Sequence, residues 1–282
     1  IDQNTFLLEP VSAENLVNNR NSRNFWCNVK GIGSWSLTGN AAEALSKKFT
    51  EMQDDSEVTA GFMWQKTTRE SKKYQLRGEI LSFIPVEKNV EVMLVTITNT
   101  GRMAQTVTPT AAIPLYGRSA DNIRDHRHVT SLLHRIETTD IGVLVTPTLS
   151  FDERGHQVNH MTYYCVGWSG NGEKPVDFYP TAEDFVGEGG NFERPYAIVK
   201  NAEGVKAGTR IEGLEAVGGL HFSEVTLEPE EECSYLIFTG ITEDIQEIRN
   251  LSKTYTTREM VLEELEKTKA YWQEKVNVAY HT

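Results

Sequence analysis

The stretch VEVMLVTITNTG, residues 90–101, decides the fold class because it has the composition of a buried strand and ends in a turn signal. β-branched residues are enriched in strands, and Asn99-Thr100-Gly101 favours a turn. The segment AQTVTPTAAIPLY, residues 104–116, follows at once with the same character. The short spacing predicts that the two segments form a β-hairpin.

Similar segments continue on both sides of this pair. They are YQLRGEILSFIP (74–85), IGVLVTPTLSF (141–151), HMTYYCVGWSG (160–170), GLHFSEVTLEP (219–229) and CSYLIFTGI (233–241). Turn clusters separate them, and no long helix alternates with them, which excludes a Rossmann-type α/β fold. The pattern predicts an all-β fold, a large antiparallel β-sandwich, over residues 58–241.

The C-terminal part, residues 242–282, has a different character. Thr256-Thr257-Arg258-Glu259 fits a Thr-x-x-Glu capping box, in which Thr256 would cap a helix. The residues that recur after it at steps of three and four are Leu262, Leu265, Lys269, Trp272 and Val276. This periodicity predicts an amphipathic helix of about 20 residues, roughly 30 Å long, that connects to a further domain.

Residues 1–57 give the weakest pattern. FWCNVKGIGSWSLTG suggests one or two strands and AAEALSKKF a short helix. We expect this segment to join the sandwich.

The composition limits the class of partner. The formal net charge is −12, which argues against nucleic acid and against anionic lipid, since both attract basic surfaces. No apolar run reaches the roughly 20 residues that cross a bilayer. Cys27, Cys165 and Cys233 are far apart and odd in number, which predicts buried thiols in a reducing compartment, the cytoplasm.

The densest ionisable stretch is GRSADNIRDHRHVTSLLHRIE, residues 117–137, with three of the seven histidines and four arginines. His126 and His128 would share one side of a strand and could begin a zinc site with His134 or Asp125, but neighbouring arginines disfavour a dication. A polar strand edge without chemistry is a second interpretation. A loop that faces a sugar, a phosphate or a partner protein is a third.

Other candidate sites have simpler structural interpretations. GIGSWS lacks the third glycine of a dinucleotide-binding loop, and GRSAD and GWSGN lack the last glycine of a nucleophile elbow. The acidic clusters AEDFVGEGG (182–190) and EPEEEC (228–233) indicate turns. Tyr163, Tyr164 and Trp168 are more typical of a core than of a sugar-stacking surface. Residue chemistry alone therefore identifies no catalytic set and no metal site.

Several ordered segments resemble one known family. VEVMLVTITNTG with VTPTAAIPLYGRSADN, then TAEDFVGEGGNFERPYAI, GLHFSEVTLEPEEECSYLIFTGITED and ELEKTKAYWQEKV are similar to the N-terminal domain of the glycoside phosphorylases of glycoside hydrolase family 94. The resemblance covers residues 58 to 280. Residues 141–172 look most like the 1,2-β-oligoglucan phosphorylases.

The resemblance implies a galactose-mutarotase-like β super-sandwich, a helical linker, an (α/α)6 catalytic barrel and a small C-terminal β domain. The family's general acid, an aspartate, belongs to the barrel, so the chain is expected to contribute no catalytic residue. The implied reaction is inverting phosphorolysis of a β-linked glucose oligosaccharide to α-glucose 1-phosphate. Inorganic phosphate is the co-substrate, and no cofactor is needed.

The resemblance also gives the 117–137 stretch a role. In the family, the corresponding loop reaches the active-site mouth of the partner in a homodimer. Asn122 matches an asparagine of related enzymes, whereas Arg124, Asp125 and His126 lack such a match. We expect these four residues to line the acceptor-sugar entrance and to supply hydrogen bonds.

Two other classes of function stay open. A mutarotase-like epimerase would use a histidine acid and a carboxylate base, and polarimetry on fresh α-glucose would detect it. A stand-alone sugar-binding or scaffold domain would have no enzyme attached, and the gene beyond Thr282 would distinguish it from a phosphorylase.

Overall fold

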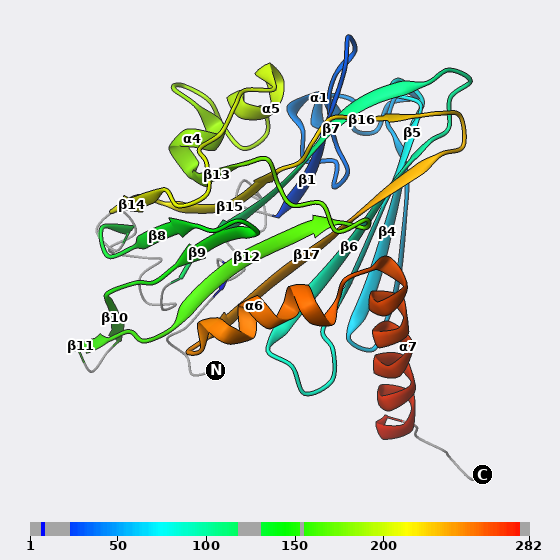
Figure 1. The fold of residues 1–282 in the computed structure, drawn as a ribbon. Coiled ribbons are helices and arrows are strands. Elements are labelled where there is room, and N and C mark those ends of the chain that lie inside the picture. Colours follow the sequence, from blue (N-terminus) through cyan, green and yellow to red (C-terminus); the bar gives the residue numbers. More distant parts are fainter. Residues whose placement is uncertain (1–6, 9–22, 118–130, 153–154, 277–282) are drawn as a thin grey trace.

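Two large antiparallel sheets form the molecule in the computed structural model, which describes residues 7–8, 23–117, 131–152 and 155–276 (Figure 1). Every strand pair is antiparallel, and two helices follow the last strand. The prediction of an all-β, antiparallel sandwich with a C-terminal helix is confirmed.

The larger sheet has nine strands. In spatial order these are β14 (Arg210–Glu212), β8 (Arg135–Thr138), β9 (Gly142–Val145), β12 (Thr162–Ser169), β17 (Glu232–Thr242), β6 (Val90–Asn99), β5 (Leu76–Phe83), β4 (Trp64–Ser71) and β3 (Asp55–Gly61).

The smaller sheet has six strands. They are β13 (Asp177–Thr181), β15 (Ala216–His221), β7 (Gln105–Leu115), β1 (Asn24–Val29) and β2 (Gly33–Ser36), with β16 (Val225–Leu227) also paired to β7. A separate two-stranded hairpin consists of β10 (Leu149–Asp152) and β11 (Gly155–Val158).

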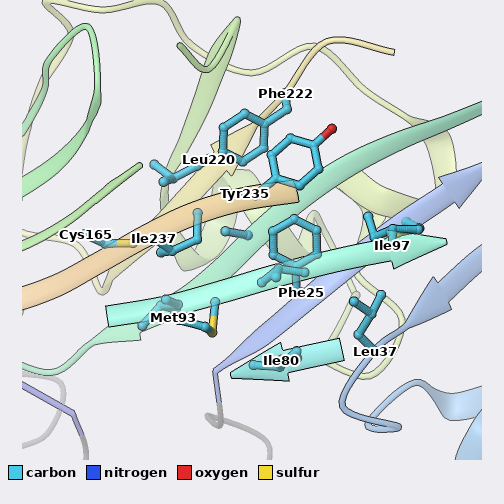
Figure 2. Close-up of a cluster of buried hydrophobic side chains, with 14 of the residues drawn as sticks. Phe25, Leu37, Ile80, Met93, Ile97, Cys165, Leu220, Phe222, Tyr235 and Ile237 are labelled. Carbon is cyan, nitrogen blue, oxygen red and sulfur yellow. The ribbon is translucent and has the colours of Figure 1, made fainter. Parts of the chain in front are cut away.

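The main core lies between the two sheets. Phe25 of β1, Ile97 of β6 and Ile237 of β17 are fully buried there and face one another with Tyr235 and Leu220 (Figure 2). Burying one such apolar side chain stabilises the fold by about 1.5–3 kcal/mol. This core holds the two sheets together.

A second core lies on the opposite face of the nine-stranded sheet. Helices α6 (Ile245–Thr254) and α7 (Arg258–Lys275) cover Leu94 of β6 and Phe238 of β17 on that face (Figure 1). Strand β6 is therefore buried on both faces, since Val95 faces the first core and Leu94 the second. Double burial explains why residues 90–97 are almost continuously apolar.

The predicted hairpin of residues 90–101 and 104–116 is wrong. Strand β6 pairs with β5 on one side and β17 on the other, so no edge of β6 is left for β7, which pairs with β1, β15 and β16 in the other sheet. Asn99 fixes the crossing between the sheets. Its buried side-chain amide donates to the carbonyls of Met103 and Leu227, and its side-chain oxygen accepts from the Gly101 amide.

The C-terminal helix forms where the periodicity places it, but its start and its buried face differ from the prediction. The N-cap is Thr257, without a side-chain cap bond, rather than Thr256 in a capping box. Val261, Leu265 and Thr268 are the buried residues, so the face is centred on the first half of the helix. Val276 lies just past its end and is exposed. The second half of α7 extends away from the sheet (Figure 1).

The described part of residues 1–57 contributes to both sheets. Strands β1 and β2 belong to the smaller sheet, and the expected short helix is α1 (Ala42–Ser46). Strand β3 begins at Asp55, so the boundary expected at residue 58 falls inside a strand of the larger sheet.

The aromatic residues proposed as core are buried. Tyr163, Tyr164 and Trp168 are at most 3% exposed, and the indole nitrogen of Trp168 donates to the Tyr255 carbonyl. They are core residues, as the sequence predicted, and not a sugar-stacking surface. Among the residues that the structure describes, no helix has the length and apolar character needed to cross a membrane.

Candidate functional site

The four residues expected at the acceptor entrance lie outside the described residues. Asn122, Arg124, Asp125 and His126 all fall within 118–130, and so does His128. Their proposed role stays a prediction. The described residues on either side of this segment nevertheless show where it begins and ends.

Described residues that flank that segment in sequence lie side by side. Gly117 follows β7, and a Cβ on this glycine would lie 3.4 Å from Nε2 of His134, 3.6 Å from Tyr163 and 3.7 Å from Pro147. Gly117 also has a φ of +59°, a left-handed conformation that glycine adopts without strain. The described residues Gly117 and His134, on either side of the segment in sequence, therefore lie close together on the sandwich.

His134 is fully buried and takes part in backbone contacts. Its Nδ1 lies 3.1 Å from the Leu214 carbonyl, its amide donates to the Ser131 carbonyl, and its own carbonyl accepts from the Gly213 amide. These contacts give His134 a structural role next to the start of β8. Within the described ranges no group of three or more histidine, cysteine or acidic side chains is arranged to hold a metal ion.

An open cleft of about 770 Å³ lies where β12, β16 and β17 meet the start of α7. Its rim is polar and mainly acidic, with Glu173, Glu231 and Glu259, while Arg258 is paired with Glu232. Phe222 and Tyr235 also line the cleft, but both are buried, and their ring centroids are 4.6 Å apart. The two rings lie next to each other in Figure 2. Because these two rings are at most 4% exposed, the cleft offers carboxylates and backbone groups rather than a stacking surface.

Both acidic clusters singled out in the sequence have structural roles. Residues 228–231 form an exposed turn before β17, as predicted, and Glu231 accepts a hydrogen bond from the Glu228 amide at 2.8 Å. Residues 182–186 are instead a one-turn helix, α4, capped by Thr181, and Gly187 ends it. A second short helix, α5 (Tyr196–Lys200), lies beside it.

A buried histidine–aspartate pair was not anticipated from the sequence. Nδ1 of His221 on β15 lies 2.6 Å from Asp177 on β13, and the two residues are opposite each other in the register. Both are buried, and Lys206 lies 3.8 Å from the other carboxylate oxygen. Only the pairing of β13 with β15 brings these residues together, and no spacing in the sequence indicates it.

This pair sits in a polar row that crosses the outer face of the smaller sheet. The register places Trp26, Thr110, His221 and Asp177 opposite one another on four adjacent strands. Trp26 packs in a buried cluster with residues of α4 and α5. Because the imidazole and the carboxylate are closed off from solvent, the pair has no access to a sugar and supports the packing of the sheet.

Glu43 of α1 is the centre of a charged cluster near β4. Its carboxylate accepts from Lys47 at 2.6 Å and from Lys73 at 2.7 Å, and it lies 2.8 Å from the Tyr74 hydroxyl. Burial alone would raise the pKa of Glu43, but the hydrogen bonds from Lys47, Lys73 and Tyr74 outweigh it and lower the pKa to about 2. Glu43 is therefore a fixed anion at neutral pH.

None of the three thiols is activated. Burial raises the pKa of Cys27 and of Cys165 well above the ordinary range. Burial also raises the pKa of Cys233 to about 11, although a hydrogen bond with Tyr235 acts in the opposite direction. A thiolate is the nucleophilic form, so these cysteines are inert at neutral pH. Cys27 and Cys165 are buried as predicted, whereas Cys233 is only partly so.

The comparison with protein families agrees with the fold. A protein-family model described as "Glycosyl hydrolase 94, supersandwich domain" matches residues 13–258. No curated protein matches the chain.

Solved structures similar to the chain include a bacterial glucoamylase complexed with acarbose, with a TM-score of 0.46, 10% identity and 88% of this chain covered. A polysaccharide lyase has a TM-score of 0.38 and 12% identity over 85% of this chain. The chain spans only 31% and 29% of the length of those two proteins. The family model covers most of the chain, and the chain therefore belongs to the glycoside hydrolase 94 family as its supersandwich domain.

Proposed function

We propose that this chain is the noncatalytic N-terminal domain of an inverting β-glucoside or oligoglucan phosphorylase of the cytoplasm. In this role it contributes to a homodimer and to the substrate entrance. The match of residues 13–258 to the supersandwich family carries the proposal. The two helices after β17 support it, because α7 continues beyond the sheet that its first half covers.

The proposed reaction divides the chemistry between two parts of the enzyme. A carboxylic acid protonates the glycosidic oxygen while inorganic phosphate attacks the anomeric carbon from the opposite face, and α-glucose 1-phosphate is released. Phosphate is itself the nucleophile, so no general base is required. The acid would belong to a barrel that follows α7.

The electrostatics of the sandwich are consistent with a noncatalytic role. A general acid needs a carboxyl group whose pKa is raised towards neutrality. The pKa of Glu43 is lowered to about 2, and the pKa of Glu259 is lowered by hydrogen bonds with backbone and with Thr257. Both groups are shifted in the direction that keeps them ionised.

Asn122, Arg124, Asp125 and His126 would supply hydrogen bonds to the acceptor sugar. The described residues Gly117 and His134, which flank this segment in sequence, lie close together on the sandwich. Amide, guanidinium, carboxylate and imidazole groups are all suited to directional hydrogen bonds with hydroxyl groups.

Kinetics of the full-length enzyme test the entrance. We expect Asn122→Ala and Arg124→Ala to raise the Michaelis constant for the acceptor by about tenfold each, with a small change in kcat, because a binding contact is lost. Lys72→Ala is the matched control, since the Lys72 side chain is 80% exposed and lies in the turn between β4 and β5. Acceptor constants equal to those of the control would reject the entrance role.

Polarimetry tests the main alternative. An epimerase needs a histidine and a carboxylate that reach the sugar, whereas His221 and Asp177 are buried. We expect the chain to leave the mutarotation rate of fresh α-glucose unchanged. An accelerated rate that Asp177→Asn abolishes would contradict the noncatalytic role.

A further inference from the structure

The turn that follows β12 contains Asn171-Gly172, and Asn171 is the only asparagine of the chain that precedes a glycine. Both residues are exposed, and Asn171 lines the open cleft. Exposed turns are in contact with water and tolerate local changes better than the elements they connect. Chemistry at this pair therefore requires no unfolding of the two cores.

The side-chain amide of Asn171 is not held in place. The backbone N–H of Asn171 donates to the Ser169 hydroxyl at 3.3 Å, but within the described part of the chain its side-chain amide has no hydrogen-bond partner. Asn191, which is also exposed, differs in this respect. Its side-chain oxygen accepts from the backbone amides of Glu193 and Arg194 at 3.0 and 2.9 Å. The Asn171 side chain is therefore free to rotate towards the next peptide bond.

The glycine leaves that peptide nitrogen open to the Asn171 side chain. Gly172 has no Cβ, and a Cβ placed there would meet no described atom within 4 Å. Its φ of +83° lies in the left-handed region, which glycine adopts without strain. A larger residue at this position would crowd its own backbone nitrogen. The turn thus combines a mobile carboxamide with an unhindered nitrogen.

We propose that Asn171 is a site of spontaneous deamidation, a reaction that makes asparagine a thermolabile residue. The Gly172 nitrogen loses its proton to hydroxide and forms a bond to the side-chain carbonyl carbon of Asn171. The bond from that carbon to the side-chain nitrogen breaks, and this nitrogen takes a proton from water and leaves as ammonia. Water then opens the cyclic imide at either carbonyl group. The products are aspartate and isoaspartate.

One hydrogen bond opposes the reaction. The Gly172 N–H donates to the Ser169 carbonyl at 2.8 Å and must leave this carbonyl before the nitrogen can attack. The net contribution of one such bond corresponds to a slowdown of roughly tenfold at most. Exposed turns also open with far less free energy than the whole domain needs to unfold. The turn therefore slows the reaction without preventing it.

The modification would change one wall of the cleft. Either product adds a carboxylate to a cleft that Glu173 and Glu231 already line. Isoaspartate also lengthens the main chain by one carbon atom, so the Gly172 N–H would no longer be positioned to donate to the Ser169 carbonyl. The reaction needs only water, so the inference does not depend on the proposed phosphorylase role.

Peptide mapping of the 282-residue chain by mass spectrometry tests the site. During incubation at 37 °C, we expect the peptide with Asn171 to gain the mass difference between an amide and an acid. The conversion should be faster at pH 8 than at pH 6, because the attacking nitrogen must be deprotonated. Asn191 and Asn201 are internal controls, since both are exposed and precede residues with a side chain. They should react roughly tenfold more slowly or less, because a Cβ crowds the nitrogen.

The variant Asn171→Gln and the unfolded chain complete the test. Glutamine keeps the amide but places its carbonyl carbon one bond farther along, so we expect no measurable conversion in the same time. An enzyme that methylates isoaspartate should label the incubated wild type and not Asn171→Gln. In urea the turn is lost, and the folded chain should react within roughly tenfold of that rate.

Two results would overturn the site. Conversion of Asn171 in urea but not in the folded chain would mean that the turn protects it. Equal conversion of Asn171, Asn191 and Asn201 would mean that Gly172 gives no advantage. Circular dichroism before and after incubation establishes that the folded chain stayed folded. Acceptor kinetics and polarimetry report on the proposed function alone, so its failure is recognised separately.

Discussion

At the residue scale, buried and half-buried ionisable side chains connect distant segments of this domain and stabilise its fold. Glu43 joins α1 to Lys73 and Tyr74, and His221 joins β15 to Asp177 on β13. Each of these contacts connects segments that are at least 30 residues apart in the chain. These ionisable groups link distant segments of the sandwich.

The lowered pKa of Glu43 makes its contribution dependent on pH. The folded pKa of about 2 lies below the ordinary value of 4.5, so the carboxylate stabilises the fold above about pH 4.5 and loses this effect as the pH falls towards 2. We expect Glu43→Gln to lower the free energy of unfolding by about 1 kcal/mol at pH 7, since water screens a side chain that is 37% exposed.

Urea unfolding at pH 7 and at pH 3 measures this effect. The difference between wild type and Glu43→Gln should shrink at the lower pH. Glu137→Gln is a suitable control, because its ion pair with Arg210 is exposed on both sides. A difference that is the same at both pH values would show that Glu43 acts through packing and not through its charge.

At the element scale, α7 is required to cover the outer face of the larger sheet. Val261 and Leu265, both at most 4% exposed, pack in the second core. The first half of the helix thus belongs to the sandwich, although the sequence suggests a connector.

Replacing Leu265 tests this packing. We expect Leu265→Ala to lower the free energy of unfolding by about 2–4 kcal/mol, because it removes buried methyl groups and leaves a cavity. Lys267→Ala, two positions along and 72% exposed at its side chain, should change it by less than about 0.5 kcal/mol. If denaturant unfolding showed the same loss of unfolding free energy for Leu265→Ala and Lys267→Ala, α7 would contribute helix propensity rather than buried apolar surface.

At the scale of the whole molecule, one sheet serves two cores. The nine-stranded sheet packs against the smaller sheet on one face and against α6 and α7 on the other. A chain that ends at Thr242 would expose Leu94, Trp168 and Phe238, all buried in the second core. The sandwich and its helices therefore form one cooperative unit.

Truncation measures this dependence. We expect the chain ending at Thr242 to bind a hydrophobic dye and to aggregate, since it exposes a large apolar surface. A chain ending at Lys275 keeps all of α7 and should behave like the full chain. A soluble, dye-free protein ending at Thr242 would show that the sheet does not need the helices.

The sequence by itself determined the class of the main strands and of the last helix. β-branched runs with turn signals predicted antiparallel strands, and a period near 3.6 predicted the last helix, because these patterns depend on neighbouring residues. The same patterns predicted the burial of Tyr163, Tyr164 and Trp168. The residues proposed for the sugar entrance come from a family resemblance, and their role stays a prediction.

Only the tertiary structure decided which sheet each strand joins. The turn after Asn99 looks the same in sequence whether β7 turns back along β6 or crosses to the other sheet. The crossing occurs because β5 and β17 occupy both edges of β6. The pairing of His221 with Asp177 depends in the same way on partners far along the chain. Hydrogen bonds between strands form across long sequence separations, so local patterns cannot specify them.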